Sequence, residues 1–408
     1  MLCAAACAAQ QLPPAPEVRV SGALALGAWS GNRVLDERKP VMARSLALAA
    51  SADLSEQLQV KFDGTLYQFP QQRGDATRGA LREAFVQWDG ASTRVRLGPQ
   101  IVAWGRADRL NPTDNVSARD YTSPFAVDET QRIGAPALSA VQELGEAGRL
   151  MLLAKRFFPS RGPSDNNETA LAVREHDQHT EYALKFDRTG AALDWSLSYF
   201  RGIEKLRSLQ LMRAPSGAGI GTVIGANRGH APLEVFGADA ATTTGSWGWR
   251  GELARLRFRD SRFERDDGRL SHWYGIVGVD TSLPHDASIG VQYFVRRFAQ
   301  APLLEGLAPA EQGLRRRLRI ANNQFHRLQD GVTVRLAQRL WNDRIDYEVV
   351  GVANLREHDH AIRPRVNLRY ADHIRLSAGA DVYRGREESF FGSLRENTAG
   401  FVEVVFIF

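Results

Sequence analysis

The chain ends in Gly400-Phe401-Val402-Glu403-Val404-Val405-Phe406-Ile407-Phe408, and this stretch decides the fold. Every second side chain from Val402 to Phe408 is apolar, which is the two-residue period of a β-strand with one apolar face. Chain termini are usually polar and frayed, whereas this one finishes on an aromatic side chain inside the strand pattern. The sequence therefore predicts that the last residues form an integral strand of a large sheet.

The same alternation recurs along most of the chain, in segments of about 9–14 residues, the length of a tilted membrane strand. Clear examples are residues 57–69, 193–199, 287–295 and 332–340. No helical period lies between the segments, so the pattern predicts one large antiparallel sheet. Alternation alone does not separate a membrane barrel from a soluble β-sandwich.

Two kinds of connection divide the strand-like segments. Eight short turns are predicted, at Ala52–Ser55, Asp89–Ala91, Gly145–Gly148, Asp187–Gly190, Thr243–Gly245, Leu283–Asp286, Trp341–Arg344 and Ala371–His373. Longer polar loops alternate with them, at 99–136, 159–178, 202–230, 299–328 and 386–397. Counting across the turns predicts 18 strands with both termini at the short-turn end. Weak strand patterns at Lys205–Arg213 and Pro232–Ala241 leave 16 strands as an alternative.

Composition narrows the class of protein. The chain has 408 residues, a mean hydropathy of −0.32 and no run of 18 apolar residues, which excludes a helical membrane protein. Strands that alternate apolar and polar residues average to such a neutral hydropathy. The two cysteines, Cys3 and Cys7, lie in the first ten residues, so the rest of the chain can form neither a disulfide nor a cysteine metal site.

The first residues are predicted to be a targeting segment. Ala6-Cys7-Ala8 fits the small-x-small cleavage pattern, so residues 1–9 are interpreted as a signal-peptide remnant. A lipoprotein with acylated Cys7 is the alternative, although the position three residues before it is Ala4 rather than leucine. Residues 10–16 then form a short lead, and 17–408 a single barrel domain with an inserted loop at 98–136.

Taken together, these features resemble a Gram-negative outer-membrane β-barrel of the porin type. The resemblance implies an all-β fold, a closed antiparallel transmembrane β-barrel of about 18 strands (16 possible), in the cell outer membrane. It also implies that Phe406 and Phe408 belong to the signal read by the barrel-assembly machinery. Outer-membrane lipid and lipopolysaccharide are the surroundings implied for such a barrel.

If the apolar faces meet lipid, the polar faces meet the lumen. Arginine on the lipid face costs about 2–4 kcal/mol at the membrane midplane, so arginines within strands are predicted to point inward. The predicted pore-lining residues are Arg94, Arg96, Arg255, Arg257, Arg335, Arg339, Arg365, Arg369 and Arg375. They either pair with interior acids into a rigid framework or, given the net charge of +5, form a positive pathway for anions. Nucleic-acid binding is not expected, because the basic residues are spread over strand interiors.

The longest connection carries the densest run of unusual residues. Its Gln100-x-x-x-Trp104-Gly105…Asn111-Pro112-x-Asp114 pattern resembles a segment of poorly characterised proteobacterial outer-membrane barrels. In porin-like barrels a long loop often folds inward and constricts the pore. The predicted constriction residues are Gln100, Trp104, Arg106, Asp108, Asn111, Asp114 and Asn115. Contact with a solute, a purely structural fold of the loop, and a calcium site through Asp108, Asp114 and Asp120 all remain open.

Two similar segments, Arg174–His179 and Arg356–His360, fall at long-loop ends of strands. They supply weak metal candidates, namely His176, His179, His358 and His360. Ordinary polar loop chemistry is one alternative, and Asp–His pairs that activate water are another. No Gly-x-Ser-x-Gly, P-loop, dinucleotide or HExxH pattern occurs, so we expect no enzyme and no cofactor.

The sequence thus favours a monomeric outer-membrane channel that passes small hydrophilic, anionic solutes through an arginine-rich lumen. One alternative is an export barrel for an acidic exopolysaccharide, which would make an acidic polymer the solute. Another is an outer-membrane hydrolase that uses the His/Asp clusters on the outer rim. A barrel that only anchors an envelope complex is a further alternative.

Overall fold

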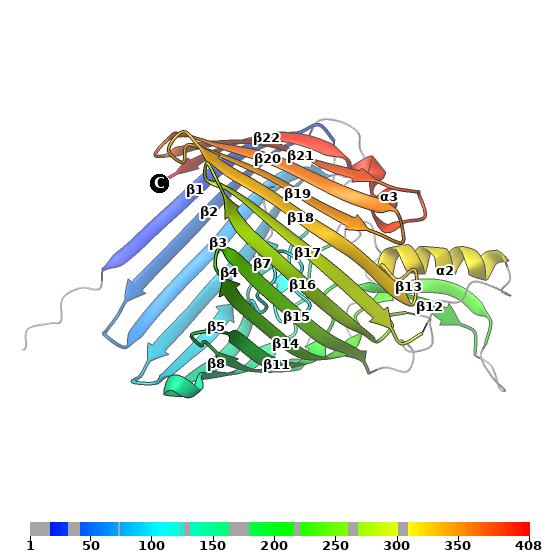
Figure 1. Cartoon of the computed structure of the whole chain (residues 1–408), viewed down its shortest axis with the longest axis horizontal. Coiled ribbons are helices and arrows are strands. Elements are labelled where there is room, and N and C mark those ends of the chain that lie inside the picture. Colours follow the sequence, from blue (N-terminus) through cyan, green and yellow to red (C-terminus); the bar gives the residue numbers. More distant parts are fainter. Residues whose placement is uncertain are drawn as a thin grey trace, which may run out of the picture.

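A computed structural model of the chain describes residues 17–31, 41–71, 74–123, 125, 131–162, 179–215, 221–259, 268–300 and 309–408. Eighteen strands form one closed antiparallel sheet, because β1 (Val18–Trp29) pairs with both β2 (Val41–Asp53) and β22 (Ala399–Ile407). Figure 1 shows the resulting barrel from the side, with the strands tilted across it. The predicted 18-stranded closed barrel is confirmed, and the 16-stranded alternative is wrong.

Around the ring, each strand pairs with its neighbour in chain order. The other barrel strands are β3 (Leu58–Gln71), β4 (Gly74–Asp89), β5 (Thr93–Gln100), β8 (Ala135–Glu143), β9 (Arg149–Arg156), β10 (Thr180–Arg188), β11 (Asp194–Ile203), β14 (Pro232–Thr244), β15 (Trp247–Phe258), β16 (His272–Leu283), β17 (Ala287–Phe298), β18 (Leu328–Leu340), β19 (Ile345–Asn354), β20 (Asp359–Ala371) and β21 (Ile374–Arg384). All eight predicted short turns connect consecutive barrel strands. Both β1 and β22 reach the short-turn end, where the Phe408 N–H donates to the Gly22 carbonyl at 3.0 Å.

Smaller elements lie at the long-loop end of the barrel, on the right of Figure 1. There β12 (Ser208–Arg213) and β13 (Val223–Gly229) form a separate two-stranded ribbon that contacts helix α2 (Pro309–Asn322), and α3 (Phe390–Ser393) lies against β20. The weak pattern at Lys205–Arg213 therefore belongs to this ribbon, and α2 was not predicted. No helix among the described residues is long and apolar enough to cross a membrane.

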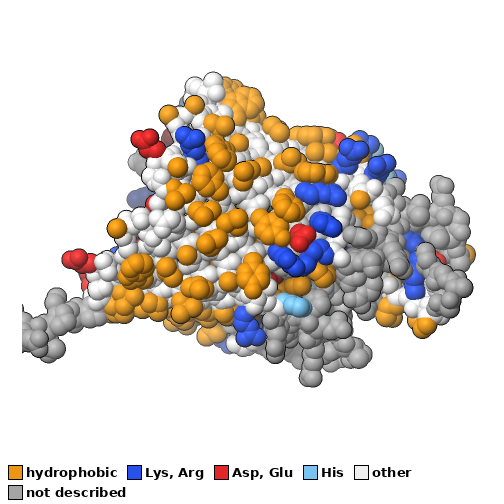
Figure 2. Space-filling model, turned by 90° about the horizontal axis from the view of Figure 1, so that it is seen from below, with side chains coloured by type: hydrophobic (Ala, Val, Ile, Leu, Met, Phe, Trp, Pro, Cys, Tyr) orange, Lys and Arg blue, Asp and Glu red, His pale blue; other side chains and the backbone are white. Residues whose placement is uncertain are grey.

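The two faces of the barrel wall separate as the alternation predicts. On β22, Val402 and Phe406 are 59% and 40% exposed on the outer face, while Phe401 and Val405 are buried on the inner face; Phe408, which follows the strand, is 63% exposed. Figure 2 shows hydrophobic side chains spread over one outer face of the barrel. This surface is the apolar band that lipid would contact.

The interior is not an empty tube. A hydrophobic cluster joins side chains of the segment between β5 and β8 to the inner face of the barrel wall. Val102, Trp104 and Val116 come from the segment, and Phe200 and Phe258 are among the wall residues that meet them. The segment therefore fills the lumen on the side of β11, β14 and β15 and leaves space on the opposite side.

Candidate functional site

The long loop between β5 and β8 folds into the lumen. Strand β5 continues to Gln100 and β8 starts at Ala135, so the loop spans 101–134 rather than the predicted 98–136. The Gln100 side chain is buried; its Nε2 donates to the Ala137 carbonyl at 3.1 Å and its Oε1 accepts from Ser139 Oγ at 2.7 Å. Gln100 therefore fixes the base of the loop to β8.

A single buried carboxylate holds the start of the loop. Glu252, on the inner face of β15, accepts hydrogen bonds from the backbone N–H groups of Arg106 at 2.6 Å, Ala107 at 2.7 Å and Thr113 at 3.2 Å. At Gly105 φ is 94°, and an added Cβ would lie 2.6 Å from Glu252 Oε1. Only glycine fits this close approach, which explains the Trp-Gly pair of the sequence pattern.

Side chains of the pattern strengthen this attachment. Thr113 Oγ1 donates to Glu252 at 2.9 Å, and Asn111 Nδ2 donates to both Glu252 at 3.2 Å and the Ala107 carbonyl at 2.7 Å. Hydrogen bonds to a charged acceptor contribute about 1.5–3 kcal/mol each, so Glu252 is the strongest anchor of the loop.

Arg106 extends the attachment to two more wall strands. Its Nε donates to Asp239 of β14 at 2.6 Å, and its Nη2 donates to Asp187 of β10 at 2.8 Å. Both carboxylates are buried, so the guanidinium neutralises charges that water does not reach. Arg106 is a structural clamp of the loop.

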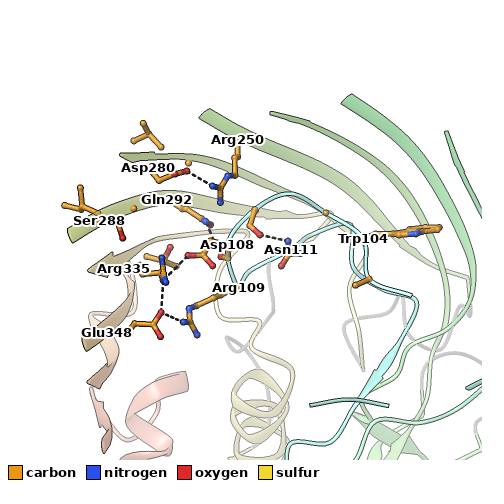
Figure 3. A pocket seen from close by; sticks show the side chains of 18 of the residues that line it. Trp104, Asp108, Arg109, Asn111, Arg250, Asp280, Ser288, Gln292, Arg335 and Glu348 are labelled. Atoms are coloured by element: carbon orange, nitrogen blue, oxygen red, sulfur yellow. Dashed lines mark hydrogen bonds and ion pairs between the residues drawn. The ribbon is translucent and has the colours of Figure 1, made fainter. Parts of the chain in front are cut away.

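The tip of the loop crosses to the opposite wall, as Figure 3 shows. Arg109 forms an ion pair with Glu348 of β19, and Glu348 also accepts from Arg335 Nε of β18 at 2.6 Å. Asp108 lies 3.9 Å from Arg335, and its carbonyl accepts from Gln292 Nε2 of β17 at 3.2 Å. The loop is thus attached at both sides of the lumen.

Asp114 organises the returning half of the loop. Its Oδ2 accepts from Arg119 and Arg132, each at 2.8 Å, which brings together β6 (Ala118–Arg119) and β7 (Arg132–Ile133). Asn115 Nδ2 closes a turn on the Pro112 carbonyl at 2.7 Å. Because the carboxylates of this loop bind arginines rather than converge, the calcium hypothesis finds no support here. Among the described residues, no group of three or more His, Cys, Asp or Glu side chains is placed to hold a metal ion.

Between the loop tip and the wall from β15 to β20 lies a cavity of about 810 Å³, which we call the main cavity. Arginine and acidic side chains both line it, and Arg250 of β15 pairs with Asp280 of the neighbouring strand β16 at 2.8 Å. The arginines are Arg109, Arg119, Arg132, Arg250, Arg335 and Arg365, and the carboxylates are Asp108, Asp280 and Glu348. Arginine stays charged at any physiological pH, so this lining carries a surplus of positive charge.

A smaller cavity of about 250 Å³ also borders the loop, at Ala103 and Trp104. Arg94 and Arg96 of β5 line it together with Arg149 and Lys185, against two acids. Arg94 Nε donates to Asp89 and Arg96 Nε to Gln87, each at 2.6 Å. Positive side chains therefore follow the lumen on both sides of the loop.

No family model matches the sequence, and no curated protein matches it either. Solved structures do resemble the fold. OccD3 (OpdP) of Pseudomonas aeruginosa matches with a TM-score of 0.55 at 9% identity, over 96% of this chain and 90% of that chain. OccK11 (OpdR) of the same organism matches with a TM-score of 0.55 at 12% identity, over 96% and 95% of the two chains.

The fold is that of the outer-membrane porins. At such low identity the likeness concerns the fold alone, and the site must be interpreted from its own residues.

Within this porin fold, seven of the nine predicted pore-lining arginines lie on the inner faces of their strands. Arg335 and Arg365 line the main cavity, and Arg94 and Arg96 the smaller one. The other three occupy inward positions of the alternation near the short turns: Arg339, Arg369 and Arg375.

The prediction that Arg255 and Arg257 line the lumen is wrong. On β15 the alternate side chains pack against the loop, so Leu253, Arg255 and Arg257 point outward. Arg255 lies 5.5 Å from the centre of the exposed Trp273 ring, and Arg257 lies 3.8 Å from Glu234. Both arginines are at the long-loop end of β15, where outward arginine costs about 0–1 kcal/mol instead of about 2–4 kcal/mol at the midplane.

Trp104 is only 5% exposed and packs in the hydrophobic cluster between loop and wall, so its role is to hold the loop. Of the weak metal candidates, His176 lies outside the described residues. His179 precedes β10, His358 lies in the β19–β20 turn, and His360 lies on β20. Among the described residues, they belong to no group of three or more His, Cys, Asp or Glu side chains that could hold a metal ion.

Glu252, Arg109 and Arg250 were missed as site residues. A signal for Glu252 and Arg250 existed: Trp247, Trp249 and Leu253 share one face of β15, which places the intervening residues inward. No local signal identifies Arg109, because its partner Glu348 lies 239 residues away.

Proposed function

We propose that the protein is an outer-membrane channel that passes small hydrophilic anions along the arginine-lined main cavity, without covalent chemistry. The observation that carries the proposal is the lining of this cavity, in which arginines outnumber carboxylates six to three. Rings or ladders of one charge sign are a general means by which pores select ions.

The arrangement of the charges favours anions further. Glu348 is shared between Arg109 and Arg335, and Asp108 lies 3.9 Å from Arg335, so the guanidiniums at the loop tip share their carboxylates. Guanidinium groups bind carboxylates and phosphates through paired N–H groups, and they remain charged throughout. A carboxylated or phosphorylated solute would therefore pass from one guanidinium group to the next along the lining of the main cavity.

The inserted loop favours small solutes. It is attached to β10, β14 and β15 through Arg106 and Glu252, and to β18 and β19 through its tip. A loop held at both walls narrows the lumen, which argues against passage of a thick acidic polymer. Among the described residues, no group of three or more His, Cys, Asp or Glu side chains could hold a metal ion for a metal-dependent hydrolase.

Replacing Arg335 with glutamine is expected to lower the anion-over-cation permeability ratio about sixfold. One unit charge about 8 Å from a passing ion contributes about 0.5 kcal/mol at the dielectric constant of water, favourable for an anion and unfavourable for a cation, so the ratio changes by about 1 kcal/mol. The measurement is the reversal potential of single channels in a planar bilayer under a salt gradient.

Arg339→Gln is the matched control, because Arg339 lies on the same face of β18 but beside Asp343 near the short turn, outside the lining of the main cavity. We expect a smaller change in the permeability ratio for this variant. Absence of conductance in the unaltered protein would contradict the channel proposal. Equal ratios for the unaltered protein and the Arg335 variant would contradict the role of the arginines.

A further inference from the structure

The outward arginines of β15 belong to a continuous row across neighbouring strands. Strand pairing sets Arg201 of β11 opposite Glu234 of β14, and Glu234 opposite Arg257 of β15. One step further along the ring, Arg255 is opposite Trp273 of β16, and Trp273 is opposite Arg297 of β17. We call Arg201, Arg255, Arg257, Arg259 and Arg297 the outer arginine row.

One carboxylate serves three members of this row. Glu234 lies 4.0 Å from Arg201, 3.8 Å from Arg257 and 3.7 Å from Arg259. Its side chain is only 13% exposed, whereas those of Arg201 and Arg257 are 55% and 63% exposed. Glu234 therefore acts as a half-buried counter-charge that lies near all three guanidiniums while they face outward.

The row borders the apolar band. Leu253 of β15 and Phe236 of β14 lie two residues nearer the short turns than Arg255 and Glu234. They are 49% and 52% exposed on the same outer face. Exposed aromatic rings lie at the height of the row, with Trp273 47% and Tyr182 56% exposed. Figure 2 shows the basic side chains gathered at the long-loop end of this face, beside the hydrophobic side chains. Long loops mark the exterior side of outer-membrane barrels, so the row lies at the level of the outer-leaflet head groups.

This geometry matches an amphiphile with phosphate groups above several acyl chains. Guanidiniums bind phosphate through paired, charge-assisted hydrogen bonds, and the neighbouring apolar band would accept the chains. A second copy of the chain fits less well. In one membrane, a two-fold dimer through this face would set the positive row against itself at the same height.

We infer that the outer arginine row is a docking site for the phosphate-bearing head group of lipopolysaccharide in the outer leaflet. The site lies on the outside of the wall from β11 to β17 and does not involve the main cavity. Arg255 and Arg257, the two arginines wrongly predicted for the lumen, would have a role at this site that depends on their outward direction.

The test is the binding of purified lipopolysaccharide to the detergent-solubilised full-length protein. The double variant Arg201→Gln, Arg257→Gln is expected to bind it at least tenfold more weakly than the unaltered protein. The matched control, Arg188→Gln with Arg344→Gln, removes the same charge from exposed positions at the short-turn end and is expected to bind normally. Heat-dependent gel mobility checks that all three proteins are folded barrels.

Dephosphorylated lipopolysaccharide provides the second arm. Dephosphorylated lipopolysaccharide is expected to bind the unaltered protein as weakly as intact lipopolysaccharide binds the double variant, because the outer arginine row binds the phosphate groups. Equal affinity of the two doubly substituted proteins would overturn the inference, as would equal affinity for the phosphorylated and dephosphorylated lipids. A change of oligomeric state in the row variant without lipid would also overturn it and would assign the row to a protein interface.

Discussion

Replacing Glu252 with alanine is expected to free the inserted loop and to increase single-channel conductance severalfold. The substitution removes the acceptor of the Arg106, Ala107 and Thr113 N–H groups and leaves these donors buried or half-buried without it. Each buried donor left without an acceptor costs about 1–3 kcal/mol, which weakens the attachment of the loop. Planar-bilayer conductance measures the opening, and amide hydrogen exchange of residues 101–117 measures the release of the loop.

Two further variants make the Glu252 experiment specific. Glu252→Gln keeps the shape of the side chain but replaces one acceptor with a donor, so it should open the channel partly. Glu143→Ala removes an exposed acid that borders the smaller cavity and should leave the loop in place. Unchanged conductance and exchange in Glu252→Ala would show that Arg106 and the hydrophobic cluster alone hold the loop.

Replacing Glu181 with glutamine is expected to give the largest loss of stability. Glu181 is fully buried on β10 and binds Lys155 at 3.0 Å and Lys205 at 2.5 Å. Its Oε1 also accepts from the Ile203 N–H at 2.8 Å. The variant leaves two buried ammonium groups without a counter-ion, which costs about 3–5 kcal/mol. Thermal unfolding in detergent, followed by tryptophan fluorescence, measures the change.

The pH dependence distinguishes this mechanism from a simple packing defect. Burial, together with the neighbouring Lys155, lowers the pKa of Lys205 from 10.5 to about 7. Between these two pKa values the unfolded chain binds a proton that the folded protein has lost, so stability from this group rises with pH. Glu181→Gln removes the charge that favours protonated Lys205, so its pKa falls further and the rise with pH starts lower.

The control for this experiment is Glu143→Gln, which removes a carboxylate that is exposed. We expect its unfolding temperature to stay close to that of the unaltered protein. A stability loss in Glu181→Gln that is equal at acidic and alkaline pH would contradict the explanation through buried lysines.

Much of the fold was predictable because its determinants are local. The two-residue period of segments such as 287–295 and the residues of the eight short turns need only near neighbours in the chain. The inward direction of Arg335 and Arg365 followed from the same alternation. The error at Arg255 and Arg257 has a local cause too, because β15 carries apolar residues on both faces near its long-loop end: Leu256 and Phe258 inward, Leu253 outward.

The candidate site was only partly predictable. The loop was expected at 98–136 and spans 101–134, and its unusual residues hold its shape. Their partners were not predictable, since Glu252 is 146 residues from Arg106. The cavity between the loop tip and β15 to β20 depends on those partners.

The sequence by itself determined the class of fold and, for most strands, the face that meets lipid, and it favoured 18 strands over 16. These properties follow from alternation and turn formation, which act over a few residues. Only the tertiary structure decided where the loop lies, which arginines surround the main cavity, and that a second set of arginines faces outward. Those features depend on charges that pair across the closed ring, and ring closure brings together residues that no local pattern connects.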